Sequence, residues 1–125
     1  MTAPLFSSTR RFRLWSYTVG HRELLLRATK EIPDSSLETR VDVLFVNVIE
    51  INIPTTLPEI EIVEADEAMR SVRPELLGDD QKLFILRGLG YIGHVVGGAM
   101  ASHEDMKEWG DPSYWHDPTR FVRPR

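Results

Sequence analysis

The chain has no cysteine, and this absence removes several kinds of chemistry at once. Disulfide bonds, catalysis by a cysteine nucleophile and thiolate metal sites are all excluded. None of its apolar stretches approaches the ~20 consecutive residues that a membrane-spanning helix needs. The length of 125 residues predicts a single domain. The two absences lead us to expect the reducing environment of the cytoplasm, with no membrane among the partners.

Basic residues are missing from the middle of the chain. Residues 41–69 contain seven acidic side chains and no basic one, whereas residues 1–40 contain seven basic and four acidic side chains and residues 70–125 contain eight of each. A nucleic-acid-binding surface has to be basic, because it neutralises phosphates. No nucleic acid is therefore expected as a partner, and the acidic block is a candidate surface for recognition of a protein.

Alternation of apolar and polar residues predicts antiparallel strands along most of the chain. Residues 12–19 and 22–29 alternate on either side of a short glycine-containing break, which is typical of a β-hairpin. Residues 40–64 alternate again and are rich in β-branched side chains, with Pro54 and Pro58 where strands should stop. The pattern predicts a mainly β fold, an antiparallel sandwich or partly open barrel of about seven strands.

The two ends of the chain and one internal connection are expected to lie outside the strands. Residues 1–11 are expected to form an N-terminal tail before a β core that spans residues 12–101. One short helical connection is predicted over residues 66–77, where Asp66 is a suitable N-cap. Residues 102–125 are predicted to form a C-terminal aromatic arm, because aromatic side chains are scattered there among prolines and polar residues.

A cluster of glycines offers the most tempting motif. Five of the eight glycines lie between Gly88 and Gly98, and the first three have the G-x-G-x-x-G spacing of a dinucleotide-binding loop. Such a loop must lead into a helix and then a second parallel strand. Each further glycine would cost that helix roughly 0.8–1 kcal/mol relative to alanine, and no apolar strand follows. No nucleotide or other cofactor is therefore expected.

The glycines are better explained by a second β-hairpin. Residues 83–87 would pair with residues 91–100 around a turn at residues 88–90, and the glycines of the returning strand would mark a bend and leave a concavity. We expect an aromatic side chain of the C-terminal arm, from this subunit or a neighbour, to fill it. The alternative is a small ligand-binding or metal-dependent enzyme barrel with its site near Gly93–Gly98 and His94.

Four histidines are the only possible nitrogen ligands for a metal. None of them has the i, i+4 spacing of a helical zinc site. His94 and His103 could meet in a barrel together with a carboxylate such as Glu104 or Asp105, and they are the two metal-ligand candidates. Histidines near turns more often serve as hydrogen-bonding partners, so no metal is expected.

Two groups of side chains are candidates for binding a partner. Glu50, Glu59 and Glu61 would lie near one another across a hairpin of residues 49–62, either as a proton-sharing group or on the solvent-facing side of the sheet. Aromatic side chains on a polar arm must be buried somewhere, either on the chain's own sheet or across a neighbouring subunit. In the arm the candidates are Trp109, Tyr114 and Trp115.

These observations favour a non-enzymatic binding or interaction module that binds a protein partner or associates with itself as a homo-oligomer. No catalytic residue is expected, because the chain contains no G-x-S-x-G nucleophile elbow and no other recognisable triad spacing. Immunity-type proteins, which neutralise a basic partner protein, offer an analogy for the acidic block.

Overall fold

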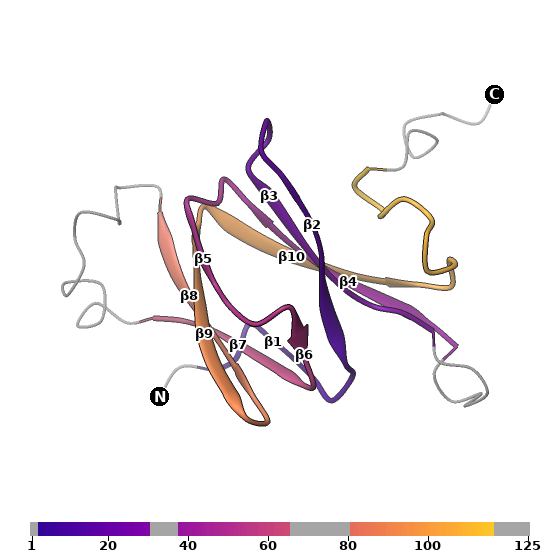
Figure 1. Cartoon of the computed structure of the whole chain (residues 1–125), viewed down its shortest axis with the longest axis horizontal. Helices are drawn as coiled ribbons and strands as arrows, with labels where there is room; N and C mark the ends of the chain where they lie inside the picture. The colour runs from indigo at the N-terminus through magenta and orange to yellow at the C-terminus, as the bar shows by residue number, and fades with distance from the viewer. Residues whose placement is uncertain (1–2, 31–37, 66–80, 117–125) are drawn as a thin grey trace.

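The computed structural model describes residues 3–30, 38–65 and 81–116, which form ten β-strands in two sheets (Figure 1). The helical connection predicted over residues 66–77 lies outside the described residues. Within the described part of the chain there is no helix, and hence none long and apolar enough to cross a membrane. The strands are β1 (Phe6–Ser8), β2 (Phe12–Thr18), β3 (Glu23–Ala28), β4 (Arg40–Val46), β5 (Glu50–Asn52), β6 (Thr56–Leu57), β7 (Ile60–Glu64), β8 (Lys82–Gly88), β9 (Tyr91–Gly97) and β10 (Ala99–Asp105).

The strands form two antiparallel sheets of five strands each. Sheet A has the spatial order β1-β7-β8-β9-β5, and sheet B has the order β10-β4-β3-β2-β6. The prediction of a mainly β, antiparallel fold is confirmed, but the expected number of about seven strands is too low. Three of the strands, β1, β5 and β6, contain only three, three and two residues, which is too short for alternation to reveal them.

The two sheets pack face to face around one hydrophobic core. Phe45 of β4 and Phe84 of β8 meet across the layers, with ring centroids 5.3 Å apart in an edge-to-face arrangement. Along β3, β4, β7 and β8, every second residue contributes to this core. Its buried members are Phe12, Leu24, Leu26, Ala28, Val41, Val43, Phe45, Val48, Leu57, Ile60, Ile62, Phe84, Leu86 and Val95.

Two of the three predicted hairpins are confirmed, those of residues 12–29 and 83–100. Strands β2 and β3 pair directly, and β8 pairs with β9 through a two-residue turn after Gly88. Gly90 has a φ of +81°, a conformation that glycine adopts at little cost and most other residues avoid. After Gly97 the chain leaves sheet A and continues at Ala99 as β10 of sheet B. The predicted bend in the glycine-rich strand is therefore a crossing between the two sheets.

The glycines of β9 do not leave a concavity for an aromatic side chain, so that expectation is wrong. A Cβ atom at Gly93 would overlap the carbonyl oxygen of Asn52, and one at Gly97 would lie 3.1 Å from the carbonyl oxygen of Val46. Main chain from β5 and from the end of β4 occupies the space instead. The glycines thus allow two backbone segments to approach closely, a packing that depends on contacts distant in sequence.

The two ends of the predicted β core continue into regular structure. Within residues 1–11, β1 forms an edge of sheet A by pairing with β7. At the other end, β10 extends through residues 102–105 before the chain leaves the sheet. Residues 106–116 follow as an irregular segment, which we call the strap. Figure 1 shows the strap, in yellow, leaving β10 at one end of sheet B.

Candidate functional site

Sheet B carries three charged side chains on the face turned away from the core. Residues of a strand alternate between faces, so Arg27, Arg40 and Asp42 point opposite to core residues such as Leu26 and Val43. An outer face normally meets water, yet these three charged residues are only 2%, 1% and 1% exposed. The outer face of sheet B is therefore covered at this place.

The three charged side chains form a compact ionic cluster. Arg27 makes a two-point contact with Asp42, from Nε to Oδ1 at 2.7 Å and from Nη2 to Oδ2 at 3.2 Å. Nη2 of Arg40 lies 3.6 Å from Oδ2 of Asp42 and 3.4 Å from Oδ2 of Asp105. Two guanidinium groups thus share one fully buried carboxylate, and a second carboxylate at the edge completes the charge balance.

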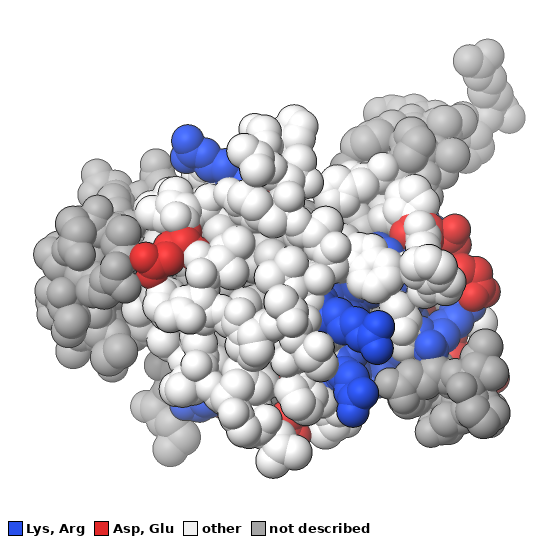
Figure 2. All heavy atoms as spheres, viewed as in Figure 1, with Lys and Arg blue, Asp and Glu red and all other residues white. Residues whose placement is uncertain are grey.

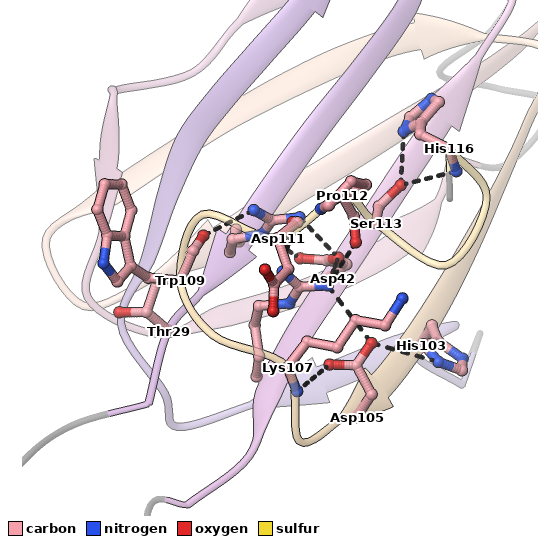
Figure 3. A network of polar contacts seen from close by, with 12 residues as sticks. Thr29, Asp42, His103, Asp105, Lys107, Trp109, Asp111, Pro112, Ser113 and His116 are labelled. Atoms are coloured by element: carbon pink, nitrogen blue, oxygen red, sulfur yellow. Dashed lines mark hydrogen bonds and ion pairs between the residues drawn. The ribbon is translucent and has the colours of Figure 1, made fainter. Parts of the chain in front are cut away.

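The strap covers this cluster and is held by it through its main chain (Figure 3). Nη1 of Arg27 donates a hydrogen bond to the carbonyl oxygen of Trp109 at 2.8 Å. Charge-assisted bonds of this kind are stronger than those between neutral groups. Arg40 donates to three further carbonyl oxygens, those of Glu108 at 2.9 Å, Asp111 at 2.6 Å and Pro112 at 3.0 Å.

The first aromatic side chain of the strap lies over β2. A shift of register between Leu14 and Ser16 leaves Trp15 without a direct partner on β3. Its ring lies 5.0 Å from the Arg27 guanidinium and packs edge-to-face against Trp109, with centroids 5.9 Å apart. Trp109 nevertheless remains 66% exposed, and Figure 3 shows its ring pointing away from the buried polar network.

The other two predicted aromatic residues of the arm gather around β10. Tyr114 stacks on His103 with centroids 4.4 Å apart and is 43% exposed. Trp115 is half-buried and meets the same imidazole edge-on, at 6.1 Å. Of the two placements expected for the arm, the described residues show the return to the chain's own sheet. The expected partner-binding aromatics therefore lie on a single surface of sheet B.

A serine, a histidine and a glutamate hold the far end of the strap. Oγ of Ser113 lies 2.5 Å from Nδ1 of His116, and Nε2 of that ring lies 2.9 Å from Oε1 of Glu23 on β3. These are the three functional groups of a hydrolase triad. Ser113 is only 1% exposed, however, and a catalytic hydroxyl must reach its substrate. We therefore assign this row of contacts to attaching the strap to β3.

The three predicted glutamates are not brought together. Glu50 lies on β5, whereas Glu59 immediately precedes β7 and Glu61 lies in it, and β8 and β9 separate these strands in sheet A. The expected hairpin of residues 49–62 does not form, because β5 pairs with β9 and β7 pairs with β8. Glu61 binds Arg87, with Oε1 2.7 Å from Nε, and Glu50 is hydrogen-bonded to His94.

The two histidines proposed as metal ligands lie in different sheets. His94 is on β9 beside Glu50, and His103 is on the outer face of sheet B, 3.5 Å from Asp105. The described residues contain no group of three or more histidine, aspartate or glutamate side chains arranged to hold a metal ion. Each histidine instead has a carboxylate neighbour within its own sheet.

The pKa of Tyr91 is clearly shifted from its ordinary value. Its hydroxyl donates a hydrogen bond to the carbonyl oxygen of Glu59 at 2.5 Å. Burial of the phenol, and then the negative charge of Glu59, raise the pKa of Tyr91 from 10.0 to about 12. Both causes favour the neutral phenol, so the folded protein retains this proton over a range of pH in which the unfolded chain loses it.

This shift predicts a loss of stability at high pH. The contribution of Tyr91 is fully present below pH 10 and is lost as the pH rises toward about 12. In the Tyr91→Phe variant, the urea midpoint should fall less steeply over this interval than in the wild type. Urea titrations of both proteins at several pH values measure the two slopes. Equal slopes would show that Tyr91 does not retain its proton in the folded state.

Comparison of the chain with protein-family models, curated proteins and solved structures gives no match. The site therefore defines only a class, a β protein of two sheets whose outer face carries an anchored aromatic strap. Alternation along β3 and β4 places Arg27 and Asp42 on the face opposite the core, but it does not reveal that this face is covered. The sequence did contain a signal that this face is covered, because the apolar residues Leu25 and Leu44 belong to it. Both are buried in the structure.

Proposed function

We propose that this protein is a non-enzymatic interaction module that binds a protein partner through the strap. The main observation in support is that Trp109 is 66% exposed on a main chain fixed from below by buried guanidinium groups. Met106 and Tyr114 are also exposed, at 69% and 43%. An indole that served only to bury the ionic cluster would have no reason to present most of its surface to solvent.

The anchoring of the strap favours binding energetically. Tryptophan and tyrosine are enriched among the residues that dominate protein interfaces, where truncating one commonly costs about 2 kcal/mol or more. Association also carries the cost of ordering mobile segments. The strap is already ordered by hydrogen bonds to four of its carbonyl oxygens, so that part of the cost is reduced.

The exposed arginines beside the strap favour an acidic group on the partner at that position. Arg13 is exposed and lies opposite Arg27 in the β2–β3 pair, and Arg11 is exposed just before β2. Figure 2 shows basic side chains grouped in this region, next to acidic side chains at the right of the view. The analogy with neutralisation of a basic partner has less support. Of the five described carboxylates within residues 41–69, three have ionic partners, namely Asp42, Glu61 and Glu64, and Glu50 is hydrogen-bonded to His94.

Truncation of Trp109 should abolish most of the binding without unfolding the protein. Tagged wild-type protein is used as bait in an extract of the organism that makes it, and the retained protein is identified and purified. We expect Trp109→Ser to weaken its affinity at least about tenfold, or 1.4 kcal/mol. The thermal midpoint should change little, because Arg27 holds the main-chain carbonyl of residue 109 and not the indole.

The matched control is Leu89→Ser. Leu89 is 71% exposed in the β8–β9 turn of sheet A, whereas the strap lies on sheet B. This variant should bind the retained protein with wild-type affinity. If Trp109→Ser also bound with wild-type affinity, or if both variants lost affinity to the same extent, the strap would not be the recognition surface.

A further inference from the structure

Strand β10 forms the longest edge of either sheet. The outermost strands of the two sheets are β1, β5, β6 and β10, which contain three, three, two and seven residues. Proteins commonly protect their sheet edges by keeping edge strands short, because an open edge pairs readily with another strand. Three of the four edges follow this rule. Within the described residues, β10 pairs only with β4, so its other side is open.

A groove runs beside this open edge, between the two sheets. It has a volume of about 350 Å³, and part of its lining is apolar, including Phe84 and Met100. Lys82 also lines the groove, where its ammonium group lies 3.7 Å from Glu64. A strand added to β10 would place every second side chain into this groove. Main-chain pairing and a receptive groove therefore coincide along one edge.

We propose that β10 pairs with β10 of a second copy of this chain, in antiparallel orientation about a two-fold axis at Ser102. This register is the one that pairs all seven residues of both strands. It sets Glu104 of one copy opposite Met100 of the other, and Asp105 opposite Ala99. A register centred nearer the C-terminal end would set acidic residues against each other, which is unfavourable.

Charge complementarity identifies a second copy as the occupant. In the β10–β4 ladder, Met100 lies opposite the core residue Phe45, so Met100 and Glu104 both point toward the groove side of the strand. Within its own copy, Glu104 accepts a hydrogen bond from Oγ1 of Thr39 at 2.5 Å. In the dimer, Glu104 of the second copy would exchange this contact for a place in the groove that Lys82 lines. The two-fold axis repeats the pair, and each copy contributes one carboxylate and one ammonium group.

This dimer would join the two sheets B into one continuous sheet of ten strands. The side chains of His103 and Asp105 lie on the outer face of β10, where His103 contacts Tyr114 of the strap. Both straps would consequently lie on the same face of the joined sheet, one on each side of the axis. The inference is independent of the partner proposed for the strap, since it involves the edge of β10 and not the strap surface.

Cysteine trapping tests the dimer against a clean background, because the wild-type chain has no cysteine. Residues directly opposite in an antiparallel pair have Cβ atoms about 4.5–5.5 Å apart, close to disulfide geometry. Under mild oxidation, Ser102→Cys should cross-link at least about tenfold faster than Ser7→Cys, owing to the high effective concentration in a preformed dimer. Ser7 is the matched control, an exposed serine in the edge strand β1.

Light scattering supplies the second measurement. The wild type should have a mass of 28.8 kDa, twice the 14.4 kDa of one chain. Ser102→Lys should have the monomer mass, because the axis sets its two ammonium groups against each other, and its circular dichroism should stay that of the wild type. A wild-type mass of 14.4 kDa would overturn the inference, as expected if β10 accepted a strand only from another protein. A 28.8 kDa species in which Ser102→Cys cross-links no faster than Ser7→Cys would show that the two chains associate through another surface. That result would also overturn the inference.

Discussion

Replacing Asp42 with asparagine is expected to lower the free energy of unfolding by about 3–5 kcal/mol. The carboxylate lies between two buried guanidinium groups, those of Arg27 and Arg40. Asparagine has nearly the same shape but no charge, so both cations would remain buried with only the peripheral Asp105 to balance them. The loss is a large fraction of the roughly 5–15 kcal/mol that stabilises a typical domain.

The matched control for Asp42→Asn is Glu61→Gln. Glu61 also binds an arginine, Arg87, but its side chain is 36% exposed and that of the arginine is 53% exposed. Exposed ion pairs contribute about 0–1 kcal/mol, so Glu61→Gln should change stability little. Urea denaturation of the two variants and the wild type measures the difference. Similar small losses in both variants would mean that the buried cluster is not a principal source of stability.

Replacing Gly93 with alanine is expected to cost about 3 kcal/mol, the upper part of the range for overpacked sites. The added methyl group would overlap the carbonyl oxygen of Asn52, which is main chain and cannot rotate away. Strand β5 would have to separate from β9, and the pairing of Ile51 with Val95 would be disturbed. Chemical denaturation gives the magnitude, and amide hydrogen exchange in β5 reports where the change occurs.

Gly20→Ala is the control for this variant. Gly20 lies in the turn between β2 and β3, and apart from its own residue and its two chain neighbours no atom lies within 4 Å of the position that its Cβ would occupy. A surface substitution of this kind usually changes stability by no more than about 0.5 kcal/mol. A Gly93→Ala protein as stable as Gly20→Ala would show that β5 adjusts easily and that the close approach is not required.

The part of the fold that could be predicted from the sequence is the part that depends on neighbouring residues. Alternation over β2 and β3 and the glycines around the β8–β9 turn indicated the two hairpins that form, because each pairs strands adjacent in the chain. The pairing of Glu50 with Val96 could not be read in this way, since nothing local to β5 indicates a partner so distant in sequence. For this reason the sequence wrongly suggested that Glu50, Glu59 and Glu61 lie together across one hairpin.

The candidate site was only partly accessible to sequence reasoning for a similar reason. Trp109 and Tyr114 were identified because aromatic side chains are conspicuous in a polar segment. Arg27 and Asp42 looked like ordinary residues on the solvent side of a sheet, since alternation tells which face a residue is on but not what covers that face. The cover is formed by carbonyl groups of the strap, and main-chain groups carry no signature in the sequence.

The way in which the strap is held separates its position from its recognition chemistry. Arg27 and Arg40 hold peptide carbonyl groups, which every amino acid possesses. Side chains such as Met106 and Trp109 can therefore be exchanged while the path of the strap is retained, as antibody loops vary on a constant framework. The strap is thus a place where related chains can diverge in specificity, and where a new binding sequence can be grafted without redesigning the fold.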